Sequence, residues 1–305
     1  MFILRRPLAS ASRRTWQSSA LVSRSIRTIT NSVVLDYQLH APANASEDKG
    51  PVLILHGLFG SKRNWNTLAQ GLSADLERPV YALDLRNHGT SPHASQMTYT
   101  DMAQDVLEFM HKHNIEQTTI IGHSMGGKVA MAVALSPYLD TRANLLKNLI
   151  VVDIAPVKAK MSPQFCDYIG AMQRIEQEKL KTRKEAADFL SAYEKDPSIR
   201  AFLLTNLVSA TSDQPHVKFR VPVGIIGKSV ADIGDFPYSP GERAWAGRTL
   251  FIKGSRSAYI NRHGIPLLES FFPNYTLEAL DAGHWVHAER PNEFKKSVVE
   301  FVGSS

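Results

Sequence analysis

Short apolar runs rich in β-branched residues alternate with longer amphipathic segments along the first half of the chain. Four to eight apolar residues bounded by turn formers are typical of buried strands, and apolar positions three or four residues apart are typical of helices. The predicted strands are Val33 to Gln38, Val52 to His56, Val80 to Asp84, Thr118 to Ile121 and Leu149 to Val152, and the predicted helices are Asn64 to Ala74, Tyr99 to Lys112 and Gly126 to Leu135. This order predicts an α/β fold with a mostly parallel central sheet flanked by helices.

Helix start signals replace this alternation in the third quarter of the chain. Thr182 with Glu185 three residues later matches a capping box. Asp196 followed by Pro197 matches an N-cap with proline at the first helical position. We therefore expect a helical cap, inserted at about residues 155 to 245. Strand patterns return at Thr249 to Lys253 and Thr276 to Leu280, and a last helix is predicted to begin near Pro291.

The net charge of +6 lies almost wholly in the first 30 residues, which contain six arginines and no Asp or Glu. Without these six, the 35 basic residues fall to 29, equal to the 29 acidic ones. The remainder of the chain is formally neutral, so its charge gives no reason to expect a nucleic-acid partner.

The first 30 residues are also rich in serine, and their apolar residues are scattered among the arginines. This composition is typical of a mitochondrial transit peptide, whereas a secretory signal needs a compact apolar core. A basic tail without a targeting role is the alternative. We expect residues 1–30 to be a transit peptide cleaved near residues 25 to 32. Residues 31–305 are then the α/β domain, located in the mitochondrial matrix.

The single cysteine, Cys166, rules out an intramolecular disulfide and fits a reducing compartment such as the matrix. It lies in a helical pattern without the neighbours of a nucleophile, so we expect a structural role. The longest apolar runs, such as Val52 to Leu55 and Leu149 to Val152, are much shorter than the roughly 20 residues of a transmembrane helix. No transmembrane segment is therefore expected.

The strongest functional motif is Gly122 to Gly127, which reads Gly-His-Ser-Met-Gly-Gly. It follows a predicted strand and opens a predicted helix, as the nucleophile elbow G-x-S-x-G requires. A sharp strand-to-helix turn needs small residues on both sides of the serine, and the start of the helix favours developing negative charge. We predict that Ser124 is the nucleophile.

A serine nucleophile needs a base, which in this arrangement comes late in the chain, after the acid. Gly283-His284 follows the last predicted strand, so we expect His284 to be the base. His287 is the alternative, but it lies further from the end of the strand and is expected to pack or hydrogen-bond locally.

Stabilising an oxyanion requires two backbone N–H groups, one directly after the nucleophile and one from the loop after an early strand. Met125 is expected to supply the first, and Leu58, in the loop His56 to Gly60, the second. We expect His56 itself to order this loop rather than to transfer protons.

The third catalytic residue is an acid that orients the base, and its position is less obvious. Many proteins with this motif order carry it after a later strand, but here that loop has Ala258 at the expected position and no acid between Lys253 and Glu269. Asp153 ends the strand before the cap, at the sheet edge where catalytic groups gather. We therefore expect Asp153 to be the acid, with Asp281 and Glu269 as weaker alternatives.

The segment Asp84 to Pro92 is dense in turn formers and is expected to be mainly architectural. We expect Asp84 and Arg86 to hydrogen-bond neighbouring loops, and whether His88 lies near the pocket is left open. The histidines and the cysteine show no zinc-binding spacing, and no phosphate or dinucleotide fingerprint is present.

Together these motifs resemble the α/β-hydrolase superfamily. Within it they are most similar to the subgroup of mitochondrial α/β-hydrolase domain-containing protein 11, fungal mitochondrial alcohol acetyltransferases and small bacterial esterases. The likeness runs from about residue 32 to the end and is carried by His56 to Ser61, Asp84 to Gly89, Gly122 to Gly127, Asp153 to Pro156 and Gly283 to Glu289. In that subgroup the acid follows the sixth strand, which implies Asp153. The cap matches least, so the substrate is not implied.

Three functions are considered. The first is a hydrolase that cleaves carboxylic esters or thioesters of short to medium acyl groups through an acyl-enzyme on Ser124. The second, implied by the resemblance, is an alcohol acetyltransferase that makes acetate esters such as ethyl acetate from acetyl-CoA and a short alcohol. The third is a binding protein that has lost catalysis, which intact catalytic motifs disfavour. The expected partners are small molecules, and the acyl-transfer chemistry needs no metal or organic cofactor.

Overall fold

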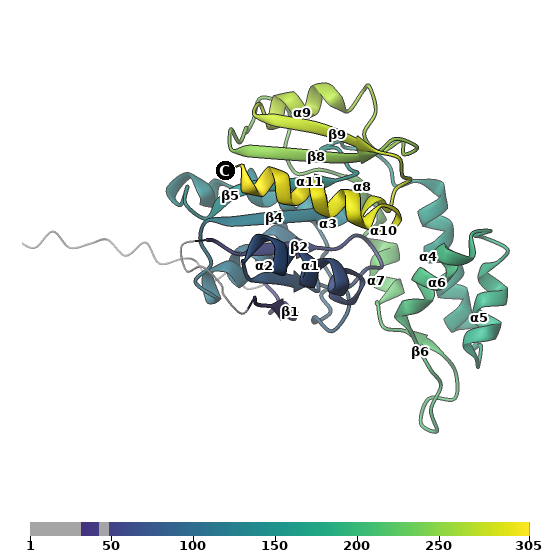
Figure 1. Ribbon diagram of the computed structural model, residues 1–305. Coiled ribbons are helices and arrows are strands. Elements are labelled where there is room, and N and C mark those ends of the chain that lie inside the picture. The colour runs from purple at the N-terminus through teal and green to yellow at the C-terminus, as the bar shows by residue number, and fades with distance from the viewer. Residues whose placement is uncertain (1–31, 43–48, 305) are drawn as a thin grey trace, which may run out of the picture. The chain divides into compact units, whose positions relative to one another are not determined.

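The computed structural model describes residues 32–42 and 49–304. The transit peptide expected at residues 1–30 lies outside them. The described strands include seven that form one sheet in the order β1-β3-β2-β4-β5-β8-β9 (Figure 1). They are β1 (Tyr37–His40), β2 (Val52–Leu55), β3 (Val80–Leu83), β4 (Thr118–His123), β5 (Leu146–Val152), β8 (Arg248–Gly254) and β9 (Tyr275–Leu280). Neighbours are parallel except for β1 and β3, so the predicted mostly parallel sheet is confirmed.

Helices cover both faces of this sheet. Helices α1 and α11 contact each other over one face, and α2 and α3 contact each other over the other. Strand β2 sends Val52 and Ile54 into the first core and Leu53 and Leu55 into the second, so all four side chains are buried. Burial on both faces explains why the strands read as continuous apolar runs. The helices around the sheet are η1 (Lys62–Trp65), α1 (Asn66–Leu76), α2 (Tyr99–Lys112), α3 (Met125–Ala134), η2 (Pro137–Thr141), α9 (Ile265–Phe271), α10 (Val286–Glu289) and α11 (Pro291–Gly303).

Two predicted strands begin three or more residues away from their start in the structure, and the other boundaries differ by at most two residues. Strand β1 begins at Tyr37 rather than Val33, because the backbone N–H of Val33 donates to the carboxylate of Asp105 instead of to a neighbouring strand. Strand β5 begins at Leu146, three residues earlier than predicted. The buried Asn148 breaks the apolar pattern there, but its side chain donates to Thr119 in β4 and so belongs to the sheet.

The segment between β5 and β8 contains a group of helices. Figure 1 shows α4, α5 and α6 together beyond the end of the sheet toward which the β4 and β8 arrows point. A ladder of two short strands, which the sequence analysis did not predict, pairs Leu207 with Phe219. The elements are α4 (Pro163–Gln177), α5 (Arg183–Leu190), α6 (Pro197–Leu203), η3 (Leu204–Asn206), β6 (Leu207–Val208), β7 (Lys218–Phe219), α7 (Val223–Lys228) and α8 (Val230–Gly234).

The helix start signals in this segment are found in the structure with one difference. Asp196 accepts a hydrogen bond from the N–H of Ser198 at the start of α6, as predicted. Thr182 accepts from the N–H of Glu185 at the start of α5, which is half of the predicted capping box. The Glu185 carboxylate accepts from the N–H of Lys181, one residue before the expected donor.

Candidate active site

Ser124 lies in a sharp turn between β4 and α3. Its backbone has φ 52° and ψ −117°, a left-handed conformation that is strained for a residue with a side chain. The neighbouring glycines make the turn possible. A Cβ atom on Gly122 would lie 2.3 Å from the carbonyl oxygen of Gly126, and one on Gly126 would lie 2.3 Å from that of Leu55. The turn therefore holds the serine side chain at the end of the sheet.

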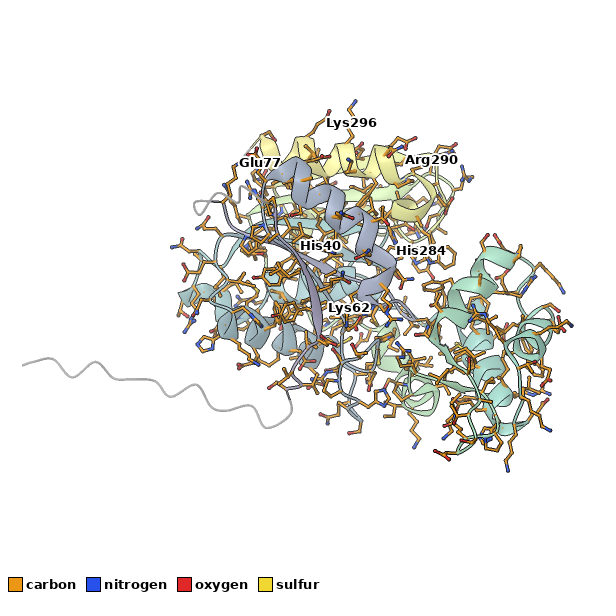
Figure 2. All side chains as sticks on the ribbon, turned by 60° about the horizontal axis from the view of Figure 1, so that its bottom comes forward. His40, Lys62, Glu77, His284, Arg290 and Lys296 are labelled. Carbon is orange, nitrogen blue, oxygen red and sulfur yellow. The ribbon has the colours of Figure 1, made fainter. Side chains whose placement is uncertain are left out.

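His284 and Asp153 complete a chain of hydrogen bonds from Ser124. Oγ of Ser124 lies 3.0 Å from Nε2 of His284, and Nδ1 of His284 lies 2.8 Å from Oδ2 of Asp153. The Asp153 side chain is fully buried, and that of His284 is 8% exposed. Figure 2 shows His284 at the edge of the sheet domain that faces the cap helices. The structure thus brings together the three residues predicted from separate parts of the sequence.

The Asp153 carboxylate is held by the loop in which the sequence lacks an acid. The backbone N–H of Gly254 donates to Oδ1 at 3.0 Å, and the hydroxyl of Ser257 donates to Oδ2. A carboxylate at the end of β5 thus reaches the histidine, while the loop after β8 supplies hydrogen-bond donors. Ser257 was not predicted from sequence, because its role depends on β5 and β8 being neighbours.

The two alternative acids lie elsewhere. Asp281 is exposed and forms ion pairs with Arg256 and Arg290 at the surface. Glu269 is exposed on α9. Neither of them contacts His284, whose Nδ1 bonds to Asp153.

The alternative base, His287, is a packing residue in this structure. Its ring stacks on Trp65 with a centroid distance of 4.1 Å and an interplanar angle of 6°. Burial, together with the neighbouring His284, lowers the pKa of His287 to about 3, so the ring is neutral. The buried His123, inside the nucleophile motif, was not singled out from sequence. Its Nε2 lies 2.9 Å from the carbonyl oxygen of His284, so with Nε2 protonated it donates a bond that fixes the backbone there.

Two backbone N–H groups beside Ser124 are available to an oxyanion. Those of Leu58 and Met125 donate to no other group in the described part of the protein. The Leu58 loop lies against the nucleophile, since a Cβ on Gly57 would be 3.3 Å from that of Ser124. An incoming carbonyl oxygen can therefore accept from both N–H groups.

His56 holds the Leu58 loop in place. Its Nδ1 lies 2.8 Å from the carbonyl oxygen of Gly57, and its Nε2 accepts from the N–H of Leu85 at 3.0 Å. Burial lowers the pKa of His56, which keeps the ring neutral and Nε2 free to accept. The expectation that His56 orders the loop agrees with these bonds.

The loop after β3 supports the Leu58 loop. Asp84 accepts from both the backbone N–H and the ammonium of Lys62, each at 2.7 Å. Arg86 forms a buried bidentate ion pair with Asp105. His88, whose place was left open, accepts through Nε2 from the N–H of Phe59 at 3.2 Å. Of the expected bonds to neighbouring loops, Arg86 makes one, to the carbonyl oxygen of Gln96, whereas its ion pair is with α2 and Asp84 binds the start of η1.

An apolar cavity of about 100 Å³ extends from Ser124 beneath the cap. Phe165 of α4 lies over the site, and Tyr259 stacks on the imidazole of His284 with a centroid distance of 4.1 Å. Neither aromatic residue was singled out from sequence, because both reach the site only through the tertiary fold. The cavity is lined by Leu58, Tyr99, Ser124, Met125, Lys128, Ile154, Val157, Ala159, Lys160, Met161, Ser162, Phe165, Ile233, Gly234 and Tyr259.

A groove of about 520 Å³ reaches His284 from another direction. It runs between α6 and α10 and is lined by Phe202, Trp285 and Ala288 among others. His284 therefore lies at the groove, while Ser124 opens into the apolar cavity. Ser124 and His284 therefore border hollows on two sides of the site.

Metal-binding groups, the cysteine and membrane-spanning helices were also sought among the described residues. Within residues 32–42 and 49–304, no group of three or more His, Cys, Asp or Glu side chains is placed to hold a metal ion. Cys166 is a free, exposed thiol on α4. Over the same residues, no helix is both long and apolar enough to cross a membrane.

Comparison with known proteins identifies the family. The family model described as alpha/beta hydrolase fold matches residues 50–291, so the chain belongs to the α/β-hydrolase family. The sn-1-specific diacylglycerol lipase ABHD11 of Xenopus laevis is 40% identical over 281 residues, which cover 90% of this chain and 86% of the relative. A probable alcohol acetyltransferase of Saccharomyces cerevisiae is 36% identical over 267 residues, which cover 83% of this chain and 77% of the relative.

A solved structure described as a marine microorganism esterase has 36% sequence identity and a TM-score of 0.78. The match covers 88% of this chain and all of the esterase. The expected resemblance to the α/β hydrolases, including the ABHD11 and alcohol acetyltransferase relatives, is confirmed.

Proposed function

We propose that this protein is a serine hydrolase that cleaves carboxylic esters or thioesters of short to medium acyl groups through an acyl-enzyme on Ser124. The observation that carries this proposal is the continuous hydrogen-bond chain, with Ser124 3.0 Å from His284 and His284 2.8 Å from Asp153. Membership of the α/β-hydrolase family supports it.

In the first half of the reaction, Nε2 of His284 takes the proton from Oγ of Ser124 as the oxygen attacks the substrate carbonyl carbon. The carbonyl oxygen becomes an oxyanion and accepts from the N–H groups of Leu58 and Met125. His284 then gives its proton to the departing alkoxide or thiolate, which leaves as the alcohol or thiol. The acyl group remains bonded to Ser124.

In the second half, His284 takes a proton from water as its oxygen attacks the acyl carbon, and the Ser124 alkoxide leaves with that proton. The acid product is released. Asp153 acts throughout by accepting from Nδ1 of His284, which keeps Nε2 available as the base.

The cavity beneath the cap supports a preference for short acyl groups. Its volume of about 100 Å³ is smaller than the roughly 150 Å³ of an apolar cavity that holds benzene, which favours a short hydrocarbon chain. Residues such as Met161, Phe165 and Ile233 make its walls largely apolar, which favours a hydrocarbon chain.

An alcohol acetyltransferase activity is the second candidate, supported by the similarity to the yeast relative. An alcohol such as ethanol would take the place of water in the second half of the reaction, with acetyl-CoA as the acyl donor. The same three residues serve both reactions. The partition between water and alcohol at the acyl-enzyme decides the principal activity. A binding protein without catalysis remains the third and least supported candidate.

We also propose that residues 1–30 direct the protein to the mitochondrial matrix. Six arginines without a single acid, in a serine-rich stretch, support this. The test is import of the full chain and of a chain lacking residues 1–30 into isolated mitochondria. Protease-protected, shortened product from the full chain alone is the expected result, and equal protection of both chains would contradict it.

The test of the catalytic proposal compares wild type with Ser124→Ala on p-nitrophenyl acetate, a short-chain diacylglycerol and acetyl-CoA, each with and without ethanol. We expect ester hydrolysis by wild type and its loss in Ser124→Ala. Ethyl acetate as the main product would favour the acetyltransferase. A Ser124→Ala variant with wild-type rates would exclude the acyl-enzyme.

A further inference from the structure

Lys128 is a buried lysine one turn into α3, about 6 Å along the helix from Ser124. It is 4% exposed, and its ammonium donates to the backbone carbonyl oxygens of Val157, Gly234 and Asp235 at 2.9, 2.9 and 2.7 Å. These bonds use all three N–H groups of the ammonium. Burial lowers the pKa of Lys128 to about 8. All hydrogen bonds of the ammonium therefore go to backbone carbonyl groups.

The three carbonyl groups belong to the two segments that connect the cap to the sheet domain. We call residues 157–159 and 233–235 the cap stem. The two segments are bonded to each other, since the N–H of Ala159 donates to the carbonyl oxygen of Gly234 at 3.0 Å. They also lie very close, because a Cβ on Gly234 would be 2.2 Å from the carbonyl oxygen of Ala159. Lys128 thus fixes both segments to the helix that follows the nucleophile.

Tyr99, the first residue of α2, makes a second connection to the cap stem. Its hydroxyl donates to the carbonyl oxygen of Ile233 at 2.7 Å, and it is 3% exposed. The Lys128 ammonium lies 5.3 Å from the centre of the Tyr99 ring. The two side chains therefore form one buried unit that binds residues 233–235 of the cap stem.

This unit lines the same cavity that contains Ser124. Leu58, Ser124 and Met125 line it at the reacting end, while Tyr99, Lys128 and the cap stem line it one helical turn further along α3. We propose that Lys128 and Tyr99 set the length of the acyl chain that the enzyme accepts, by holding the cap stem across the cavity away from Ser124. This inference rests on the proposed function.

The physical reason is the cost of moving the stem. An acyl chain longer than the cavity must push the stem outward, and this separates the buried ammonium from its three carbonyl acceptors, of which those of Val157 and Asp235 have no other donor among the described residues. A short acyl chain fits without this movement. Loss of the ammonium removes this connection. We therefore expect kcat/KM for long acyl chains to rise relative to kcat/KM for short ones.

The experiment uses the full chain and measures kcat/KM for p-nitrophenyl acetate, butyrate and octanoate. Lys128→Met keeps the unbranched side chain and removes the ammonium, and Tyr99→Phe removes only the hydroxyl. The matched control is Lys228→Met, because Lys228 is exposed at the end of α7 and lines neither the cavity nor the groove. We expect the octanoate to acetate ratio to rise about tenfold in Lys128→Met and about threefold in Tyr99→Phe. The control is expected to keep the wild-type ratio.

Labelling of Ser124 with a fluorophosphonate separates the two possible failures. A variant that is labelled and active but keeps the wild-type ratio overturns this inference and leaves the proposed function intact. Absence of labelling and activity in folded wild type overturns the proposed function and this inference with it. If Lys128→Met does not fold, Tyr99→Phe is the test. An unchanged octanoate to acetate ratio in that variant overturns the inference.

Discussion

Ser257 donates its hydroxyl to the buried carboxylate of Asp153, 104 residues away in the chain. The oxygen that accepts this bond, Oδ2, is also the one that faces Nδ1 of His284. The loop after β8 therefore contributes to the site although it carries no acid. Its serine fixes the orientation of a carboxylate that comes from β5.

Removing this hydroxyl tests how much the orientation of Asp153 matters. A hydrogen bond to a charged group contributes about 1.5–3 kcal/mol, so Ser257→Ala is expected to lower kcat/KM about 10- to 100-fold. The bond from Gly254 to Oδ1 remains and limits the loss. Ser255→Ala, in the same loop, is the control, since Ser255 bonds to the carbonyl oxygen of Leu280 through its backbone N–H. Equal rates in the two variants would show that Ser257 does not position the acid.

Asp153→Asn tests the acid itself. An amide at this position can present an N–H to His284, which favours the tautomer that cannot accept the Ser124 proton, and kcat is expected to fall about 10⁴-fold. Asp281→Asn is the matched control, because Asp281 bonds only to Arg256 and Arg290 at the surface among the described residues. Steady-state hydrolysis of p-nitrophenyl acetate measures both. A larger loss in Asp281→Asn than in Asp153→Asn would reverse the assignment.

The nucleophile, the base and the alternation of strands and helices along the chain were predictable from sequence because their requirements are local. The turn at Ser124 needs glycine at 122 and 126, and these glycines are visible in the sequence. Asp153 could be chosen because the rival loop lacks a carboxylate and because strand ends meet at one edge of a parallel sheet. In each case, residues close by in the sequence indicated the role.

Residues that reach the site only through the tertiary fold have no such signal in the sequence around them. Ser257, Phe165 and Tyr259 reach the site only because β5 neighbours β8 and the cap lies over the sheet edge. The ladder of β6 and β7 has two residues in each strand, too few for a pattern. Lys128 was the exception, since a lysine in an otherwise apolar helix could have been noticed.

The Leu58 loop gives a prediction about oxyanion binding. A Cβ on Gly57 would lie 2.8 Å from Nδ1 of the buried His123, so Gly57→Ala is expected to push the loop away from Ser124. Loss of one oxyanion donor typically costs 10²–10³-fold in kcat, and we expect about 100-fold here. Gly224→Ala on α7 is the control, because a Cβ there has no neighbour within 4 Å. A Gly57→Ala variant with near wild-type kcat would show that this approach is not needed for catalysis.

His88 gives a prediction about stability at acid pH. Its Nε2 accepts from the N–H of Phe59, and burial lowers its pKa to about 3 from 6.5. Between these values the unfolded chain binds more protons than the folded one, so the free energy of unfolding rises with pH. This contribution is complete above about pH 6.5 and is lost as the pH falls toward 3.

Each such histidine adds up to about 1.4 kcal/mol per pH unit to the slope of stability against pH. His88→Gln is therefore expected to lower that slope by about this amount between pH 4 and 6. Urea unfolding at several pH values in this range measures it. Gln70→Ala, at an exposed position on α1 without a titratable group, is the control and should leave the slope unchanged. A wild-type slope in His88→Gln would mean that His88 becomes protonated in the folded state as readily as in the unfolded chain.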